Sequence, residues 1–223
     1  MNTCKFCERT FKSEQTLAKH MCTKKQRMAD KDTIGAQLGY RVFQRFYELS
    51  TTGKKPKSFM DFIESQYYIA FVKFGRHLVA LNPIDSNDFV DYVIKNAIKL
   101  SDWQKDKVYS DYLRIHMEKE PVDRAVERSI IEMGEWSKNS NMPLSDFFTH
   151  INTIEAVFLI KSGRISPWVL YLSDSSSKLL ADFTEEQLAL VKEVIDPRAW
   201  QHTFISNPND VTFVKHILRE AGL

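Results

Sequence analysis

Cysteine is scarce in this chain and confined to one place. Only three cysteines occur among the 223 residues, and all of them lie within the first 22 positions. An odd, clustered set provides no disulfide framework for the rest of the chain, so we expect a reducing compartment. Thiols gathered at short spacings favour metal binding over chance.

Long apolar runs are absent as well. The most apolar stretches, "AVFLI" and "WVLYL", are much shorter than the roughly 20 residues that a membrane-spanning helix needs. The first residues show no charged-then-apolar leader, so we expect no secretory signal. With 43% hydrophobic and 27% charged residues, the composition is typical of a globular protein. We expect a soluble, cytoplasmic protein without a membrane partner.

Signals for a catalytic site are missing. Among seven glycines only Gly35 and Gly39 lie close together, and their spacing favours close contact between helices over a phosphate-binding loop. The histidines after position 20 are isolated, and none belongs to an HExxH pair. We therefore predict a protein that is not an enzyme, with no evident small-molecule substrate. A metal-dependent nuclease with dispersed carboxylates is the less favoured alternative.

Helical patterns dominate from Thr33 onward. Apolar residues recur every three to four positions, and capping residues or prolines separate the segments. The stretch "SFMDFIESQYYIAFVKFGRHLVAL" predicts one long helix that Pro83 stops, and Thr184 with Gln187 form a capping-box spacing. No run alternates like a strand between hairpin turns. We predict an all-α helical body over residues 33–223.

The N-terminal stretch "CKFCERTFKSEQTLAKHMC" has the spacing of a small metal-bound module. Cys4 and Cys7 stand three apart, Phe11 and Leu17 follow at fixed offsets, and His20 comes next. This arrangement resembles the C2H2 zinc-finger family at each of these positions. The resemblance implies a ββα finger over residues 1–24, with Zn2+ as the cofactor and the two apolar residues packed beneath it.

The fourth ligand departs from the family pattern. The family expects a second histidine three to five residues after His20, but Lys24, Lys25 and Gln26 stand there. Cys22 is the nearest remaining donor. Residues two apart point to opposite sides of a helix, so His20 and Cys22 can both bind only if the helix ends at His20. The alternative is that this cysteine-bearing amphipathic segment binds no metal. A basic tether over residues 25–32 follows, either flexible or a continuation of the finger helix.

Positive charge is concentrated in the first quarter of the chain. Residues 1–57 hold 13 Lys/Arg and 5 Asp/Glu, whereas the remaining residues hold 18 and 24. Such asymmetry favours binding of DNA or RNA by the N-terminal part. Carried over from the family by position, the base-contacting residues are Ser13, Gln15, Thr16 and Lys19. Phosphate contacts are predicted for Arg9, Lys12, Lys24, Lys25, Arg27, Arg41 and Arg45, and Lys54, Lys55 and Lys57 extend this basic track.

One stretch of the body, "GRISPWVLYLS", is rich in residue types that dominate protein interfaces. Arg164, Trp168 and Tyr171 are therefore candidates for docking a protein partner, and burial in the core is the alternative. Together these features predict a non-catalytic nucleic-acid-binding protein whose helical body docks a protein. The alternative is a protein-docking or virion-assembly factor that uses the finger as a structural knob.

The finger, the Lys/Arg tether and the body with "GRISPWVLY" together look like zinc-finger proteins of T4-like tailed phages. This resemblance implies no defined activity. It would place the protein in a bacterial host cytoplasm during infection, in DNA metabolism, transcription or virion assembly.

Overall fold

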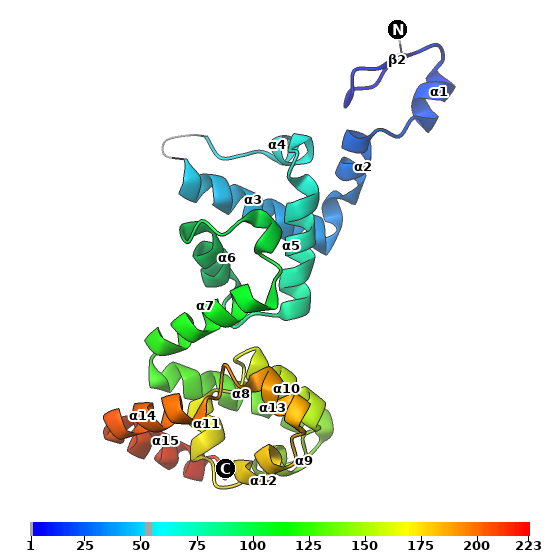
Figure 1. The fold of residues 1–223 in the computed structure, drawn as a ribbon. Coiled ribbons are helices and arrows are strands. Elements are labelled where there is room, and N and C mark those ends of the chain that lie inside the picture. Colours follow the sequence, from blue (N-terminus) through cyan, green and yellow to red (C-terminus); the bar gives the residue numbers. More distant parts are fainter. Residues whose placement is uncertain (1, 52–54) are drawn as a thin grey trace. The chain divides into compact units, whose positions relative to one another are not determined.

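The computed structural model describes residues 2–51 and 55–223, and it divides into two compact units, residues 1–105 and 106–223 (Figure 1). The expected all-α character is confirmed for the described residues, in which strands occur only near the N-terminus. The predicted division into a finger, a tether and one helical domain concerns independent folding and stays a prediction.

The first unit begins with two short strands and a helix, in the expected ββα order. Strands β1 (Asn2–Thr3) and β2 (Thr10–Phe11) pair antiparallel, and helix α1 (Glu14–Lys19) follows. The segment predicted as a tether is helical: α2 (Thr23–Ala29) leads into a 3-10 turn, η1 (Asp30–Asp32). It is a helix of its own because the chain is extended between α1 and α2.

The rest of the first unit is built around a close pair of helices. Its remaining elements are α3 (Ile34–Ser50), α4 (Phe59–Glu64), α5 (Tyr68–Leu81), α6 (Ser86–Lys95) and η2 (Leu100–Asp102). Helices α3 and α5 have the most extensive contact in this unit. A Cβ at Gly75 would lie 2.6 Å from the carbonyl oxygen of Gly35 and 2.7 Å from the amide nitrogen of Gly39. The predicted role of Gly35 and Gly39 in close helix contact is therefore confirmed.

Six large aromatic side chains fill the core of this unit. Each is almost fully buried, and they are Phe43, Phe62, Phe71, Phe74, Phe89 and Trp103. Edge-to-face contacts connect several of the rings, including Phe74 with Trp103 at 5.0 Å between centroids. The Trp103 indole N–H donates to the Ile98 carbonyl at 2.9 Å, so its polar atom is satisfied inside the core.

The single long helix predicted for residues 58–81 is wrong, because the chain breaks between α4 and α5. Ser65 is extended (φ −61°, ψ 136°), and its hydroxyl accepts a hydrogen bond from the Tyr67 N–H at 3.1 Å. The break leaves the carbonyls of Ile63 and Ser65 available to Arg27, whose guanidinium donates to them at 2.6 and 3.0 Å. A side chain distant in sequence thus compensates the lost helical hydrogen bonds.

The second unit is helical throughout its described length. Its helices are α7 (Asp106–Lys119), α8 (Val122–Ser140), η3 (Leu144–Asp146), α9 (Phe147–His150), α10 (Thr153–Lys161), α11 (Pro167–Leu172), α12 (Ser176–Ala181), α13 (Glu185–Val191), α14 (Pro197–Ser206) and α15 (Pro208–Glu220). The predicted capping box of Thr184 and Gln187 is present at the start of α13. Helix α11 lies at the centre of the unit, with Trp168 and Leu170 buried against its neighbours.

Membrane-spanning helices are not found in residues 2–51 and 55–223, since no helix there combines the required length with the required apolarity.

Candidate metal centre

A tight turn between β1 and β2 presents the first two cysteines. The Cys4 N–H donates to the Arg9 carbonyl at 2.9 Å, and the Glu8 N–H donates to the Cys4 carbonyl at 2.8 Å. Glu8 takes a left-handed conformation (φ 58°) to close the turn. The chain reverses within a few residues, so both sulfurs face the same side.

Backbone amides prepare the Cys4 sulfur for the ionised form. The N–H groups of Phe6 and Cys7 point at this sulfur and hold the pKa of Cys4 below its ordinary value. The Arg9 N–H favours the Cys7 thiolate in the same way. Burial and the neighbouring sulfurs of Cys4 and Cys22 outweigh that effect and raise the pKa of Cys7. Ionised thiols at such distances repel one another, so a cation bound between them would stabilise the thiolate forms.

Helix α1 positions the histidine and ends where the metal site needs it to end. The Ser13 hydroxyl accepts the Thr16 N–H at 3.2 Å and caps the start of the helix. His20 is the C-cap, with an extended backbone (φ −67°, ψ 126°). Because the helix stops at Lys19, the expected condition for His20 and Cys22 to bind together is met.

Cys22 lies in the short extended link and also starts the next helix. Its sulfur accepts the Lys25 N–H at 3.4 Å and caps α2. The Lys25 ammonium donates to the His20 carbonyl at 3.0 Å and to the Ala18 carbonyl at 3.4 Å. These bonds hold the link between α1 and α2 in the conformation that brings the two donors to one side.

The four donors converge on one point. The ligand atoms of Cys4, Cys7, His20 and Cys22 all lie within 4.8 Å of one another, and Cys7 Sγ is 3.3 Å from His20 Nε2. A tetrahedral ion with metal–sulfur bonds of about 2.3 Å keeps its ligands about 3.5 to 3.8 Å apart. This Cys3His cluster could therefore hold a metal ion, and its donor set fits zinc.

The surroundings of the cluster are those of a structural site. Cys4 is buried, the other three donors are half-buried, and the His20 ring packs on Phe11 at 4.6 Å between centroids. Four protein donors fill a tetrahedron and leave no position for a substrate. Within the described residues this is the one group of three or more His, Cys, Asp or Glu side chains placed to share an ion.

The structure separates the predicted nucleic-acid contacts into two groups. The first group lies on the finger and is exposed, and it comprises Arg9, Lys12, Ser13, Gln15, Thr16 and Lys19. The Ser13 and Thr16 hydroxyls hydrogen-bond to each other at 2.7 Å. Arg9, Lys12 and Lys19 make no ion pair within the described part of the chain.

Most of the second group makes contacts inside the first unit. Lys24 pairs with Glu64 at 2.6 Å, and Lys25 and Arg27 bind backbone carbonyls as described above. The Arg45 guanidinium forms a bidentate pair with Asp91 at 2.6 and 2.7 Å, which lowers the pKa of Asp91 to about 2.

Arg41, one turn before Arg45 on α3, is exposed instead. Lys55 and Lys57 follow the residues left undescribed, and Lys54 lies outside the described residues.

The residues predicted to dock a partner make internal contacts in the second unit. Trp168 is buried, and Arg164 pairs with Glu132 at 2.6 Å. The Tyr171 hydroxyl donates to the Ile195 carbonyl. Trp168 thus belongs to the core, whereas Arg164 and Tyr171 are partly exposed, and docking of a partner by this stretch stays a prediction.

Sequence reasoning missed two features. Lys5, between the first two cysteines, is an exposed cation whose ammonium lies 5.2 Å from the Phe6 ring centroid, and its place in the Cys-x2-Cys turn could have indicated it. A cavity in the second unit was also missed, because its walls come from segments far apart in the sequence.

Comparison with known proteins yields no relative: no family model, no curated protein and no solved structure matches the chain. The resemblance to proteins of T4-like phages therefore stays a prediction, and the metal centre is interpreted from its own geometry.

Proposed function

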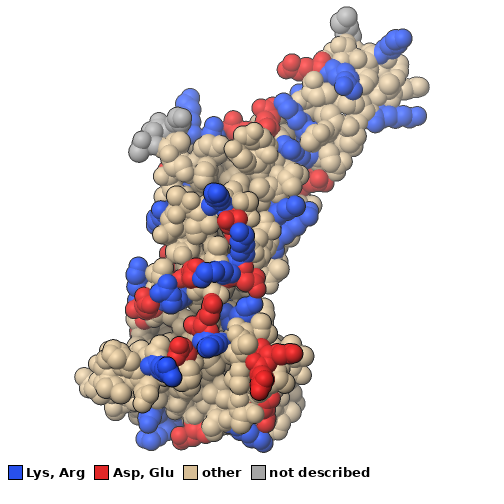
Figure 2. All heavy atoms as spheres, viewed as in Figure 1, with Lys and Arg blue, Asp and Glu red and all other residues tan. Residues whose placement is uncertain are grey.

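We propose that the protein binds nucleic acid without catalysis, through an N-terminal finger folded around Zn2+. One observation carries this proposal. Arg9, Lys12 and Lys19 are exposed on the finger with no ion pair in the described residues, whereas Lys24, Lys25, Arg27 and Arg45 behind it are engaged by carboxylates and carbonyls. Figure 2 shows cationic side chains over the N-terminal part of the first unit.

Zinc is the proposed ion because the donor set is three sulfurs and one imidazole nitrogen. Thiolates select against Mg2+ and Ca2+, and a closed tetrahedral arrangement is typical of structural zinc. The finger has few apolar contacts of its own, and α1 contains no buried residue. Metal binding would therefore supply most of the free energy that folds residues 2–22.

The proposed contacts are mainly with phosphates. Arg9 and Lys12 would neutralise phosphate groups, and Lys19 would add positive charge beside its predicted base contact. Gln15 is the exposed side chain best suited to a base edge. A single finger covers only about three base pairs, so we expect weak sequence preference and strong salt dependence. Arg41 is a further exposed cation of the first unit that would add one phosphate contact.

Fluorescence anisotropy tests the proposal. Labelled duplex DNA, single-stranded DNA and RNA are titrated with the zinc-loaded protein between about 50 and 200 mM salt. Neutralising Lys12 and Lys19 (Lys12→Gln/Lys19→Gln) should lower the salt slope by about one for each lost phosphate contact. The matched control is Lys138→Gln/Lys178→Gln, which removes the same charge from exposed positions of the second unit. Absence of binding to all three nucleic acids at low salt would reject the proposal.

Protein docking by the finger is the second candidate, and one residue favours it. Met21 lies between the candidate ligands His20 and Cys22 and is 56% exposed, so its apolar side chain faces solvent beside the proposed metal centre. A fixed, exposed methionine suits an apolar pocket on a protein partner. If nucleic acid does not bind and a protein partner is lost on Met21→Ser, docking is the function.

A further inference from the structure

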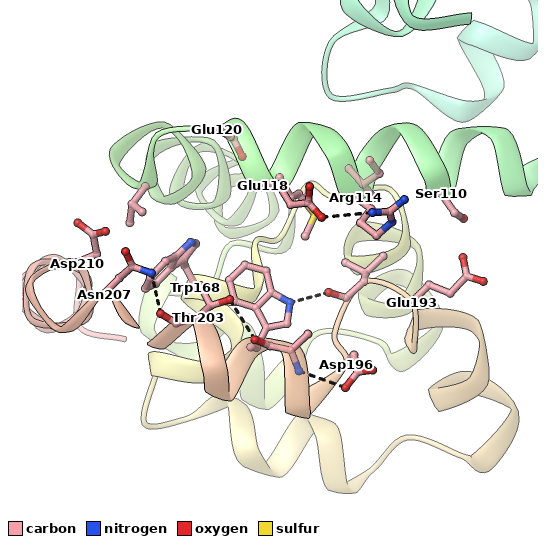
Figure 3. Close-up of a pocket in the computed structure, with 16 residues that line it drawn as sticks. Ser110, Arg114, Glu118, Glu120, Trp168, Glu193, Asp196, Thr203, Asn207 and Asp210 are labelled. Carbon is pink, nitrogen blue, oxygen red and sulfur yellow. Dashed lines mark hydrogen bonds and ion pairs between the residues drawn. The ribbon is translucent and has the colours of Figure 1, made fainter. Parts of the chain in front are cut away.

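The second unit contains a cavity of about 400 Å3 that the finger does not account for (Figure 3). Helix α7 provides one wall with Ser110, Arg114 and Met117, and the segment from Glu193 through α14 provides the opposite one. This volume lies in the range of small-ligand sites, which is about 300 to 1,000 Å3.

Two tryptophans give the cavity a rigid aromatic lining. Trp200 is half-buried, and its indole N–H donates to the Val194 carbonyl at 2.9 Å. The buried Trp168 meets Trp200 edge-to-face, at 5.8 Å between centroids and 81° between planes, and Phe204 packs on both. The orientation of the Trp200 ring is thus set by the protein before any ligand binds.

The charged side chains of the lining are predominantly acidic. They comprise five carboxylates and one guanidinium, namely Glu118, Glu120, Glu193, Asp196, Asp210 and Arg114. Arg114 pairs with Glu118 at 3.3 Å, and Glu120 pairs with Arg128 at 2.8 Å. Glu193, Asp196 and Asp210 make no ion pair within the described residues, although the Asp196 carboxylate accepts the N–H groups of Arg198 and Ala199 at the start of α14. The lining therefore keeps a net negative charge.

This combination selects one class of ligand. A lining with a net negative charge repels an anion, and the carboxylates are too dispersed to share a metal ion, because the described residues form only the N-terminal ligand cluster. An aromatic face attracts organic cations. Leu113, Met117 and Val122 add apolar surface for a hydrocarbon stem.

We propose that this cavity binds an organic cation, an ammonium or guanidinium group carried on a short apolar stem. The cation lies against Trp200 and is attracted by the negative charge of the lining, with Glu193 and Asp196 at one end of the cavity and Asp210 at the other. Two sources share this chemistry, a free polyamine and the Lys or Arg side chain of a peptide. The proposal is independent of the function proposed for the finger.

Isothermal titration of the full-length, zinc-loaded protein with spermidine and with the peptide acetyl-Gly-Lys-Gly-amide tests the proposal and distinguishes the sources. Pentanol and valerate are the neutral and anionic comparisons. The principal variant is Glu193→Gln/Asp196→Asn, in which asparagine keeps the N-cap of α14. Trp200→Leu removes the aromatic face. The control Glu185→Gln/Glu186→Gln removes the same charge from the exposed start of α13.

We expect at least one of the two cations to bind, with pentanol and valerate binding at least tenfold more weakly. Glu193→Gln/Asp196→Asn and Trp200→Leu should each lower the affinity for the cation at least tenfold. The control should change that affinity less than twofold. Binding of spermidine alone indicates a free amine, and binding of the peptide indicates a protein side chain. The proposal is overturned if neither cation binds at millimolar concentration, if pentanol binds as well, or if Glu193→Gln/Asp196→Asn binds like the unaltered protein.

Discussion

The guanidinium of Arg27 lies over the ring of Tyr68, 4.5 Å from its centroid. The same guanidinium donates to the carbonyls of Ile63 and Ser65, at the break between α4 and α5. Arg27 was predicted to contact phosphates, but this geometry makes it the connection between α2 and the helical part of the first unit. A guanidinium that the sequence leaves free to contact phosphates here donates to backbone carbonyls.

Replacing Arg27 should therefore destabilise the first unit. We expect Arg27→Gln to cost about 2 kcal/mol, because two charge-assisted hydrogen bonds and the contact with Tyr68 are lost. Arg27→Lys should restore little of the lost stability, since an ammonium cannot present the same planar pair of N–H donors. Urea unfolding followed by circular dichroism measures the change. The control Lys31→Gln removes an exposed charge nearby and should leave the midpoint unaltered.

Metal binding should depend on Cys22 and not on its neighbour. With Co2+ in place of zinc, the thiolate charge-transfer absorption should fall by about a third in Cys22→Ser, because one of three thiolates is lost. The affinity of Cys22→Ser for Co2+ should fall as well, whereas Met21→Ser should keep both the absorption and the affinity of the unaltered protein. An unchanged spectrum in Cys22→Ser would show that another group completes the tetrahedron.

Removal of the metal should affect the finger more than the helices behind it. A chelator should abolish hydrogen-exchange protection in α1, whose residues are all at least partly exposed. Protection in α3 and α5 should persist, since their contact depends on the glycines and the aromatic core. Simultaneous loss of protection in all three helices would contradict this.

Local signals in the sequence predicted part of this architecture well. The early end of α1 followed from the requirement that His20 and Cys22 share one ion, and the contact at Gly35 and Gly39 followed from their spacing. Both predictions rest on residues only a few positions apart, where helix geometry decides which side chains meet.

Contacts between residues far apart in the sequence could not be predicted from such local spacings. The break at Ser65 contains neither glycine nor proline, and it is compensated by Arg27 from a separate helix. Asp91 engages Arg45 from α6, and nothing near Arg45 in the sequence indicates that partner. The local partner Glu48, three residues after Arg45, can be found in the sequence, whereas the distant partner Asp91 is seen only in the fold.

Glycine substitutions in the α3–α5 contact should show a strong dependence on position. Gly75→Ala should lower the free energy of unfolding by about 3 kcal/mol. Its Cβ would lie 2.6 Å from the Gly35 carbonyl oxygen, and the backbone of α3 can shift only by disrupting its packing. Gly134→Ala on α8 is the matched control, since nothing lies within 4 Å of its Cβ. That substitution should stabilise the second unit by about 1 kcal/mol through helix propensity. Urea midpoints of the two variants should move in opposite directions.

The Arg45–Asp91 pair should make stability depend on pH in the acid range. Arg45 lowers the pKa of Asp91 from 3.8 to about 2. The folded state therefore favours the ionised carboxylate, and its contribution is complete above pH 3.8 and is lost as the pH falls toward 2. Because Arg45 is 43% exposed and screened by solvent, we expect about 1 kcal/mol. Arg45→Gln should reduce this loss between pH 4 and pH 2 in urea unfolding, and the remainder should persist because Lys95 also pairs with Asp91 at 3.0 Å.

Arg41→Gln is the matched control, since Arg41 is exposed on the same helix one turn earlier. It should leave the acid-range loss intact and instead reduce the salt slope of nucleic-acid binding, whereas Arg45→Gln should leave that slope unchanged. The two arginines would then be separated by function: Arg45 holds α3 to α6, and Arg41 faces the phosphates. Equal effects of both variants on the salt slope would contradict this separation, because a guanidinium held by two carboxylate oxygens has few donors left for phosphate.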